Sequence, residues 1–434
     1  MFIFLAIFWE KCYNNTVMNT ELTHDQQRAE QLVNEWFFYT DDQSFVLSGY
    51  AGTGKTFLLS YLIDQSLKLK AGEDAVFVTP TGKAAAVLIK NGTPAGTVHG
   101  LIYTRDEDDF DVDENGEIVK NDRLTFVKKE KIYEKIRLIV VDEASMVGED
   151  VLRDLLSFGV KCLFCGDGAQ LPPVNGNTEL LKNPDCTLTE IVRQAADNPV
   201  IRLSKMAREG KYIPYGNYGD TVSVISRYSL TRAQRRKIFL EADQIICGRN
   251  KTRAELNDEI RWYKGISKSE KLPLDGEKLI CTLNDWEQPL DADGKFHLVN
   301  GVIGICENVA ESEDMLGTLD FTADFTGESV RVPFDTMIFT HGEYAHYYGD
   351  RAVTLADGRV VHENKYAHFR KVKAEKEEPI CRFEFAYAVT CHKAHGSEFN
   401  FVVVFDESWA FGEDKYRWLY TAITRAKEKL LIIR

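Results

Sequence analysis

The stretch that decides the fold is Gly49-Tyr50-Ala51-Gly52-Thr53-Gly54-Lys55-Thr56, a complete G-x-x-x-x-G-K-[ST] phosphate loop. It follows a strand-like run at 44–47 and leads into an apolar, helix-like run at 57–63. The glycines let the backbone turn its N–H groups toward a phosphate at a helix N-terminus, where the helix dipole also favours negative charge. Lys55 can then reach the β- and γ-phosphates, and the Thr56 hydroxyl can bind Mg²⁺. The stretch predicts a nucleoside triphosphate ligand, against the alternative of a glycine-rich structural turn.

The composition is that of a globular chain with about two or three domains. Of its 434 residues, 44% are hydrophobic and 28% are charged, as in soluble proteins. The formal net charge of −14 argues against a polybasic nucleic-acid coat, although a single groove can still be basic. Of the nine cysteines, only Cys162 and Cys165 form a C-x-x-C, and on a strand this spacing puts the two side chains on opposite faces. We expect buried, reduced thiols in an intracellular, cytoplasmic protein.

The apolar run at 2–9 is too short to span a membrane and lacks the basic flank and cleavage site of a signal peptide. We therefore expect no membrane segment and no targeting signal. A better-behaved sequence begins after Met18. Our hypothesis is that translation starts at Met18 and that residues 1–17 are an upstream extension. In the expected domain division, residues 1–20 are an N-terminal extension, unstructured or not native. Mass spectrometry of the protein from its native locus would contradict this by finding Met1 or Phe2.

Strand-like runs alternate with helical stretches on both sides of the phosphate loop. The runs lie at 45–48, 76–79, 138–141 and 162–165, and a helix is expected to begin after Thr23 as its N-cap. This alternation predicts an α/β fold with a parallel sheet covered on both faces. Ligands of such sheets bind at the carboxyl ends of the strands, and each motif described next falls at such an end.

Two acids follow the run at 138–141, in Val140-Val141-Asp142-Glu143. Asp142 is positioned to hold Mg²⁺ through water, and Glu143 to polarise the attacking water, as in P-loop hydrolases. Gln170 follows the next run, and its neutral amide is suited to sensing a γ-phosphate or orienting water without adding charge. The three motifs in this order predict a nucleotide hydrolase, rather than acids and amides of solvated turns.

With these motifs the chain resembles superfamily 1 helicases, and more closely their RecD/Dda-like branch, over about residues 22–433. Further motifs carry the resemblance: Leu22-Thr-His-Asp-Gln26 for the Q motif, Thr79-Pro-Thr81-Gly-Lys83 for motif Ia, Gly96-Thr97-Val-His99 for Ib, Leu188-Thr-Glu-Ile-Val-Arg193 for IV, Thr390-Cys-His392-Lys393-Ala-His395-Gly396 for V, and Tyr420-Thr-Ala-Ile-Thr424-Arg425 for VI. The sequence departs from the family at His395, where glutamine is usual, and at Gly168, where proline is frequent.

The resemblance implies a role for each matched position. The implied catalytic residues are Lys55, Asp142, Glu143, Gln170, Arg193 and Arg425, and the implied Mg²⁺ ligands are Thr56 and Asp142. ATP would contact Gln26, Gly49, Gly52, Thr53, Gly54, Lys55, Thr56, Gln170, Arg193 and Arg425. The implied DNA contacts are Thr81, Lys83, Thr97, His99, Asn250, Thr390, His392 and Lys393.

The two arginines have a physical role beyond the resemblance. Hydrolysis spreads negative charge over the equatorial oxygens of the γ-phosphate, and an arginine entering from a second lobe stabilises that charge only when the cleft is shut. Hydrolysis of the nucleotide would thereby be coupled to closure of the cleft. Taken alone, Arg193 or Arg425 would instead be read as a salt-bridge residue.

The strand pattern and the resemblance together divide the chain. We expect a first RecA-like lobe at 21–194, a second RecA-like lobe in two parts at 195–295 and 379–434, and a small inserted β-barrel domain at 296–378. A β-hairpin insertion at about 104–135, with Asn115-Gly116 at its turn, is predicted to be a strand-separating wedge. An acidic surface loop is the alternative.

The expected function is that of an ATP- and Mg²⁺-dependent helicase that moves 5′ to 3′ on single-stranded DNA and opens forked DNA. The resemblance also suggests a monomer, with replication or recombination proteins as the class of partner. The residues leave open whether RNA serves as well. Two rivals are a P-loop kinase, which would transfer phosphate to a small molecule without DNA, and an ATP-switched binding module, which would hydrolyse slowly with or without DNA.

Overall fold

The structure is a computed structural model that describes residues 21–105, 110–112, 118–120, 126–172, 180–192, 198–292, 294, 296–311, 316–341, 350–354, 360–364 and 380–434. The chain forms two compact units. Unit 1 comprises 1–104, 128–222 and 411–424, and unit 2 comprises 105–127, 223–410 and 425–434. The N-terminal extension, the Asn115-Gly116 turn and Arg193 lie outside the described residues. The lobe boundaries expected from the sequence stay a prediction.

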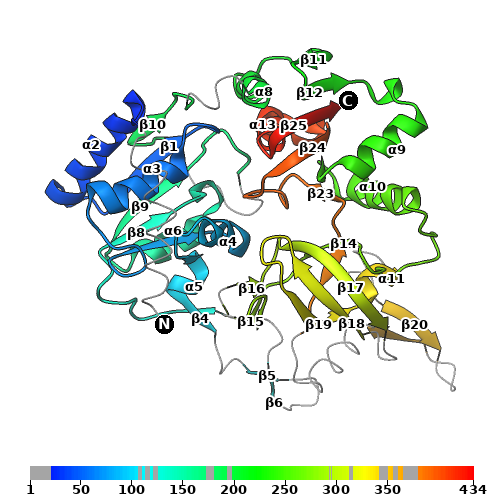
Figure 1. Cartoon of the computed structure of the whole chain (residues 1–434). Coiled ribbons are helices and arrows are strands. Elements are labelled where there is room, and N and C mark those ends of the chain that lie inside the picture. The colour runs from blue at the N-terminus through cyan, green and yellow to red at the C-terminus, as the bar shows by residue number, and fades with distance from the viewer. Residues whose placement is uncertain are drawn as a thin grey trace. The chain divides into compact units, whose positions relative to one another are not determined.

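Unit 1 contains a six-stranded parallel sheet in the order β10-β1-β9-β8-β2-β3, drawn mainly in blue and cyan in Figure 1. Its strands are β1 (Ser44–Gly49), β2 (Ala75–Thr79), β3 (Ala95–Thr97), β8 (Leu138–Val141), β9 (Lys161–Gly166) and β10 (Cys186–Leu188). Strands β1, β2, β8 and β9 occur where the apolar runs predict them, whereas β3 and β10 have no predicted run. The predicted parallel sheet is confirmed.

Helices cover both faces of this sheet. They are α2 (His24–Tyr39), α3 (Lys55–Tyr61), α4 (Gly82–Lys90), α5 (Val98–Ile102) and α6 (Glu149–Leu156). One core cluster joins α2 and α3 to Leu47 and Cys165, and the other joins α5 and α6 to Val46 and Cys162. The two cysteines of the C-x-x-C therefore lie on opposite faces of β9, as the strand period of two requires. Both thiols are buried and free.

Helix α2 begins at the predicted position because of a capping box. The Thr23 side chain accepts a hydrogen bond from the backbone of Gln26, and the Gln26 side chain accepts one from the backbone of Thr23. These two bonds satisfy N–H groups that the first helical turn leaves without partners. The cap fixes the start of α2 and, at the same time, the orientation of Gln26.

A second sheet has the order β11-β12-β25-β24-β13-β23, and its last four strands run parallel. The strands are β11 (Gly216–Tyr218), β12 (Val222–Ile225), β13 (Gln244–Cys247), β23 (Ala388–Thr390), β24 (Phe399–Phe405) and β25 (Ala426–Ile433). The helices α8 (Pro199–Arg208), α9 (Arg232–Glu241), α10 (Asn250–Tyr263) and α13 (Lys415–Ile423) alternate with them along the chain. Buried side chains of α9 and α10 pack on β13 and β24.

A five-stranded antiparallel sheet is inserted within unit 2, in the order β19-β18-β17-β14-β22, drawn mostly in yellow in Figure 1. Its strands are β14 (Lys278–Cys281), β17 (Ile303–Glu311), β18 (Leu316–Ala323), β19 (Ser329–Asp335) and β22 (Phe383–Phe385). Both β14 and β22 lie outside the predicted insertion at 296–378, and each has only three or four residues. A bridge pairs Phe334 of β19 with Cys381, and closure into a barrel stays a prediction.

Unit 2 also contains several shorter elements. They are β15 (Asp285–Pro289), β16 (His297–Leu298), α11 (Met337–His341), β20 (Asp350–Thr354) and β21 (Val360–Asn364). In the hairpin insertion, β5 (Phe110–Val112) pairs antiparallel with β6 (Ile118–Lys120). These strands flank the predicted Asn115-Gly116 turn. None of the helices in the described ranges has both the length and the apolar character that a membrane crossing requires.

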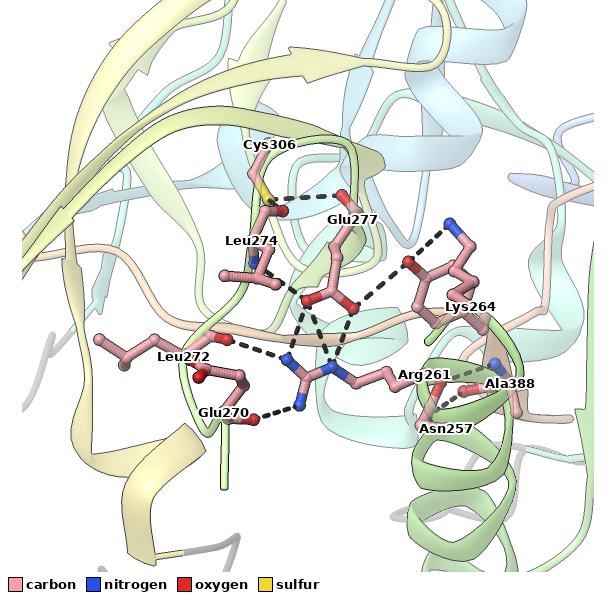
Figure 2. Close-up of polar contacts among 10 residues, drawn as sticks. Asn257, Arg261, Lys264, Glu270, Leu272, Leu274, Glu277, Cys306 and Ala388 are labelled. Carbon is pink, nitrogen blue, oxygen red and sulfur yellow. Dashed lines mark hydrogen bonds and ion pairs between the residues drawn. The ribbon is translucent and has the colours of Figure 1, made fainter. Parts of the chain in front are cut away.

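A buried ion pair joins α10 to the inserted sheet (Figure 2). Arg261 near the end of α10 and Glu277 just before β14 have side chains that are 7% and 2% exposed. The guanidinium group donates to both Glu277 oxygens and to the carbonyl oxygens of Glu270 and Leu272. Tyr387, where the chain leaves the inserted sheet, donates to the same carboxylate over 3.4 Å. The pair thus holds the two chain segments that enter and leave this sheet.

Candidate nucleotide-binding site

The phosphate loop connects β1 to α3, and its glycines have two structural roles. Gly52 and Gly54 have φ angles of +80° and +76°, in the left-handed region that favours glycine. At Gly49 the reason is space, since a Cβ atom would lie 2.9 Å from both the Lys55 side chain and the Thr53 hydroxyl. Two glycines therefore allow the turn, and the third leaves room for the lysine.

Three carboxyl groups lie near Lys55, at the carboxyl ends of β8 and β9. Asp142 and Glu143 follow β8, and Asp167 follows β9. Burial by itself lowers the pKa of Lys55, but the surrounding negative charge, that of Asp167 above all, raises it beyond its ordinary value. Lys55 is therefore a cation, and its Nζ donates to the carbonyl oxygen of Tyr50 over 3.3 Å.

The two predicted Mg²⁺ ligands contact each other. The side chain of Thr56 is hydrogen-bonded to Asp142, and the backbone N–H of Glu143 donates to Asp142 Oδ1 over 2.9 Å. Burial, and then the charge of Glu143, raises the pKa of Asp142 to about 6. Mg²⁺ prefers oxygen ligands, and a bound cation would lower that pKa again. The hydroxyl and carboxylate fit this ion.

Glu143 has a strained backbone and an unsatisfied side chain. Its φ of +53° is left-handed, which is uncommon for a residue with a Cβ and is concentrated at functional sites. Its Oε2 is buried and has no hydrogen-bond partner among the described residues. Burying a polar atom in this way is unfavourable, and a water molecule held on this oxygen would satisfy it. This is the arrangement expected of a group that polarises water.

Gln170 lies in the loop after β9, where its side chain is 6% exposed. Its Oε1 is a second buried atom without a hydrogen-bond partner in the described part of the chain. The next residue, Leu171, donates its backbone N–H to the Thr421 hydroxyl of α13 over 2.9 Å. Helix α13 therefore helps to position the loop that carries Gln170.

Gln26 contacts the phosphate loop through atoms that the resemblance assigns to the adenine base. Its Oε1 accepts the Thr23 backbone N–H at 3.1 Å, and its Nε2 donates to the Thr53 carbonyl oxygen at 3.0 Å. The side chain is 3% exposed. In this structure Gln26 joins the start of α2 to the phosphate loop, and its reading of adenine stays a prediction.

Two side chains near the loop were not found from the sequence. The Tyr420 hydroxyl of α13 donates to Asp167 and accepts the backbone N–H of Ala51 over 2.9 Å. The guanidinium carbon of Arg208, at the end of α8, lies 3.5 Å from the centroid of the Tyr50 ring. Such stacking on an aromatic face is favourable for arginine. Tyr420 lies within the motif VI segment, and only that neighbourhood could have indicated it.

The predicted DNA contacts of unit 1 lie on two helix starts. Thr81 caps α4 by accepting the Ala84 N–H, and Thr97 caps α5 by accepting the Gly100 N–H. His99 is exposed at the start of α5. Lys83 is only 5% exposed, so its side chain is covered in this structure. Contact of these residues with DNA stays a prediction.

In unit 2, an ion-pair network restrains one of the predicted DNA contacts. Lys393 Nζ lies 2.5 Å from Glu384 Oε2, and the same oxygen is 2.7 Å from Arg253 Nη1. The other three predicted contacts differ in exposure: Asn250 is exposed at the start of α10, His392 is half-buried, and Thr390 is buried at the end of β23. A DNA phosphate would compete with Glu384 for Lys393.

Arg425 is 4% exposed and donates to the Ser397 carbonyl oxygen over 3.3 Å. Burial, and then the positive charge of Arg425, lowers the pKa of His395 to about 3. The imidazole is therefore neutral at pH 7. A neutral side chain beside Arg425 is what the usual glutamine would also provide, so the departure at His395 conserves charge at this position.

Comparisons with known proteins give two domain matches. A family model described as an AAA domain matches residues 21–224, and one described as a UvrD-like helicase C-terminal domain matches residues 385–433. The first match contains the phosphate loop, and the second contains Arg425.

Individual proteins and a solved structure also match. The ATP-dependent RecD2 DNA helicase of Deinococcus radiodurans is 32% identical over 182 residues, 40% of this chain and 22% of that protein. An uncharacterized protein of Acanthamoeba polyphaga mimivirus is 28% identical over 179 residues, 37% of this chain and 34% of that protein. The matched parts thus span well under two thirds of these relatives. A crystal structure of Pif1 helicase from Bacteroides, in complex with ADP-AlF3 and ssDNA, aligns with a TM-score of 0.49 at 19% identity, covering 95% of this chain and 92% of that chain.

Proposed function

Since this chain belongs to the superfamily 1B helicases, we propose that it is an ATP-dependent DNA helicase that translocates on single-stranded DNA and unwinds duplexes. Its substrates would be single-stranded and forked DNA. ATP would bind at the phosphate loop, with Mg²⁺ held by Thr56 and Asp142. Binding through the DNA backbone permits stepping regardless of sequence.

The observation that carries this proposal is the arrangement around Lys55. The cation and Thr56 begin helix α3, which follows β1 and the phosphate loop. Asp142, which is hydrogen-bonded to Thr56, and Glu143, with its unpaired oxygen, follow β8. A metal ion here would neutralise charge on the phosphates. Lys55 would contact the β- and γ-phosphates, while Glu143 would take a proton from the attacking water. Gln170 would orient that water.

The steps that couple hydrolysis to movement are finer proposals. Arg425, and Arg193 outside the described residues, would reach the γ-phosphate in a closed cleft and stabilise the transition state. The DNA strand would be held by the predicted DNA contacts, which are Thr81, Lys83, Thr97, His99, Asn250, Thr390, His392 and Lys393. The 5′ to 3′ direction rests on the resemblance to the RecD/Dda-like branch. A monomeric cytoplasmic enzyme acting with replication or recombination proteins completes the proposal.

The test is ATP turnover with and without single-stranded DNA. The wild-type protein should hydrolyse ATP faster when DNA is added, and Lys55→Ala should lose turnover. Glu143→Gln keeps the shape of the side chain and removes the base, so it should bind nucleotide while its turnover falls by at least about 100-fold.

Three results would contradict the proposal in different ways. Near-normal steady-state turnover by Glu143→Gln would remove that residue from catalysis. Phosphate transfer to a small molecule without DNA would favour a kinase. Equally slow hydrolysis with and without DNA would favour a binding module that uses ATP as a switch.

A further inference from the structure

The Tyr420 hydroxyl occupies a donor of the phosphate loop. Tyr420 is completely buried on α13, and its oxygen accepts the backbone N–H of Ala51 over 2.9 Å. Ala51 is the third residue of the phosphate loop, whose backbone N–H groups bind phosphate oxygens. The tyrosine oxygen therefore takes the role that a phosphate oxygen would have on this N–H group.

The Tyr420 hydroxyl cannot donate a hydrogen bond to Asp167 and to a phosphate oxygen at the same time. A phenol has a single O–H donor, and that of Tyr420 is directed to Asp167 Oδ2. Burial, and then the charge of Asp167, raises the pKa of Tyr420, so the proton stays on the phenol. A phosphate oxygen arriving at the Ala51 N–H would meet the lone pairs of the phenol. One of the two oxygens must then leave.

Helix α13 has a second contact with the site. The Thr421 hydroxyl accepts the backbone N–H of Leu171, the residue after Gln170. Neighbouring residues of one helix thus contact both the phosphate loop and the loop of Gln170. The helix ends at Ile423, two residues before Arg425. A change in the bonds of Tyr420 alters the restraints on this helix.

We propose that Tyr420 is a positioning residue that responds to the occupancy of the phosphate loop. Its hydroxyl holds Ala51 and Asp167 together before nucleotide binds, and a phosphate oxygen of the nucleotide displaces it from the Ala51 N–H. Release of this bond transmits nucleotide binding to α13. The inference rests on the proposed function, because it requires a nucleotide at the phosphate loop.

The test compares Tyr420→Phe with the wild-type protein. Loss of one competing hydrogen bond should tighten binding of ADP and of a non-hydrolysable ATP analogue by about threefold to tenfold. The KM for ATP should fall by a similar factor, while the DNA-stimulated kcat falls because the helix no longer responds. Tyr416→Phe is the matched control on the same helix, since in the described residues its hydroxyl makes no hydrogen bond to the phosphate loop.

Unchanged or weaker nucleotide binding by a folded Tyr420→Phe protein would overturn the inference. A wild-type protein that binds no nucleotide would instead overturn the proposed function. If Tyr420→Phe does not fold, 3-fluorotyrosine introduced at position 420 keeps the hydroxyl. Its ¹⁹F resonance should shift when Mg²⁺-ADP is added, and a resonance that stays in place under saturating nucleotide would overturn the inference.

Discussion

Replacing Glu277 by glutamine would leave the guanidinium charge of Arg261 buried without its counter-ion. The two side chains are 7% and 2% exposed, and Arg261 Nε lies 2.8 Å from Glu277 Oε1. Removing one partner of a buried ion pair destabilises a protein by about 3–5 kcal/mol. Glutamine retains one acceptor oxygen, and Arg261 keeps the Glu270 and Leu272 carbonyl groups. We therefore expect the lower end, about 3 kcal/mol.

The measurement is hydrogen exchange during urea titration, read on peptides of α10 and β14. Because the chain has two compact units, a local readout is needed to assign the loss to unit 2. The control is Asp150→Asn, which breaks the exposed Arg153–Asp150 pair of α6 in unit 1. It is read on peptides of α6, where we expect a loss of less than about 1 kcal/mol.

A double variant separates the charge from the packing. Arg261→Met with Glu277→Leu removes both charges and should recover most of the stability, because a matched apolar pair is often as stable as a buried ion pair. If Glu277→Gln costs no more than Asp150→Asn, the burial of this pair does not stabilise the junction, and our reasoning is wrong.

Four further predictions concern the proposed motor. Arg425→Ala should lower ATP turnover by about 1,000-fold or more with little change in DNA affinity, whereas lost DNA binding with normal turnover would make it a DNA contact. Burial keeps the pKa of His395 at about 3 in the fold, against an ordinary value near 6.5, so the unfolded chain takes up a proton first and stability falls with pH below about 6.5. His395→Gln should therefore lose less stability than the wild type between pH 7 and pH 5 in urea unfolding. Asn115→Ala with Gly116→Ala should impair duplex unwinding but not movement on single strands, and equal loss of both would contradict a wedge. Duplexes with only a 5′ tail should be opened in preference to those with only a 3′ tail in low salt, and the reverse preference would overturn the branch assignment.

The phosphate loop and the parallel sheet could be predicted because their signals are local. The loop is a continuous motif. The strands β1, β8 and β9 are apolar runs, and each is followed directly by a segment that carries predicted site residues. The Thr23-x-x-Gln26 spacing is itself a capping-box signature, so the cap formed by Gln26 could also have been found. The resemblance to the Q motif directed attention to the base instead.

The contacts of Tyr420 could not be predicted, since the hydroxyl and the Ala51 N–H are separated by 369 positions. No local pattern specifies a pairing across such a distance. The pairing of β22 with β14 could not be predicted for a related reason. Strand β22, with three residues, pairs with β14 far earlier in the chain, and so short a strand has no periodicity to detect. The burial of Lys83 likewise depends on tertiary packing.

The left-handed backbone of Glu143 lowers the stability of the fold, although the proposed activity requires this side chain. Glycine adopts φ = +53° without the strain that a side chain causes, strain that amounts to about 1–3 kcal/mol. Glycine would also remove the unsatisfied carboxylate oxygen from the interior. If Glu143 has the catalytic role that we propose, the Glu143→Gly protein should be inactive and yet more stable than the wild type, apart from the added freedom of its unfolded chain. Directed evolution for expression or heat resistance alone would favour loss of this side chain, so such a selection must also require ATP turnover.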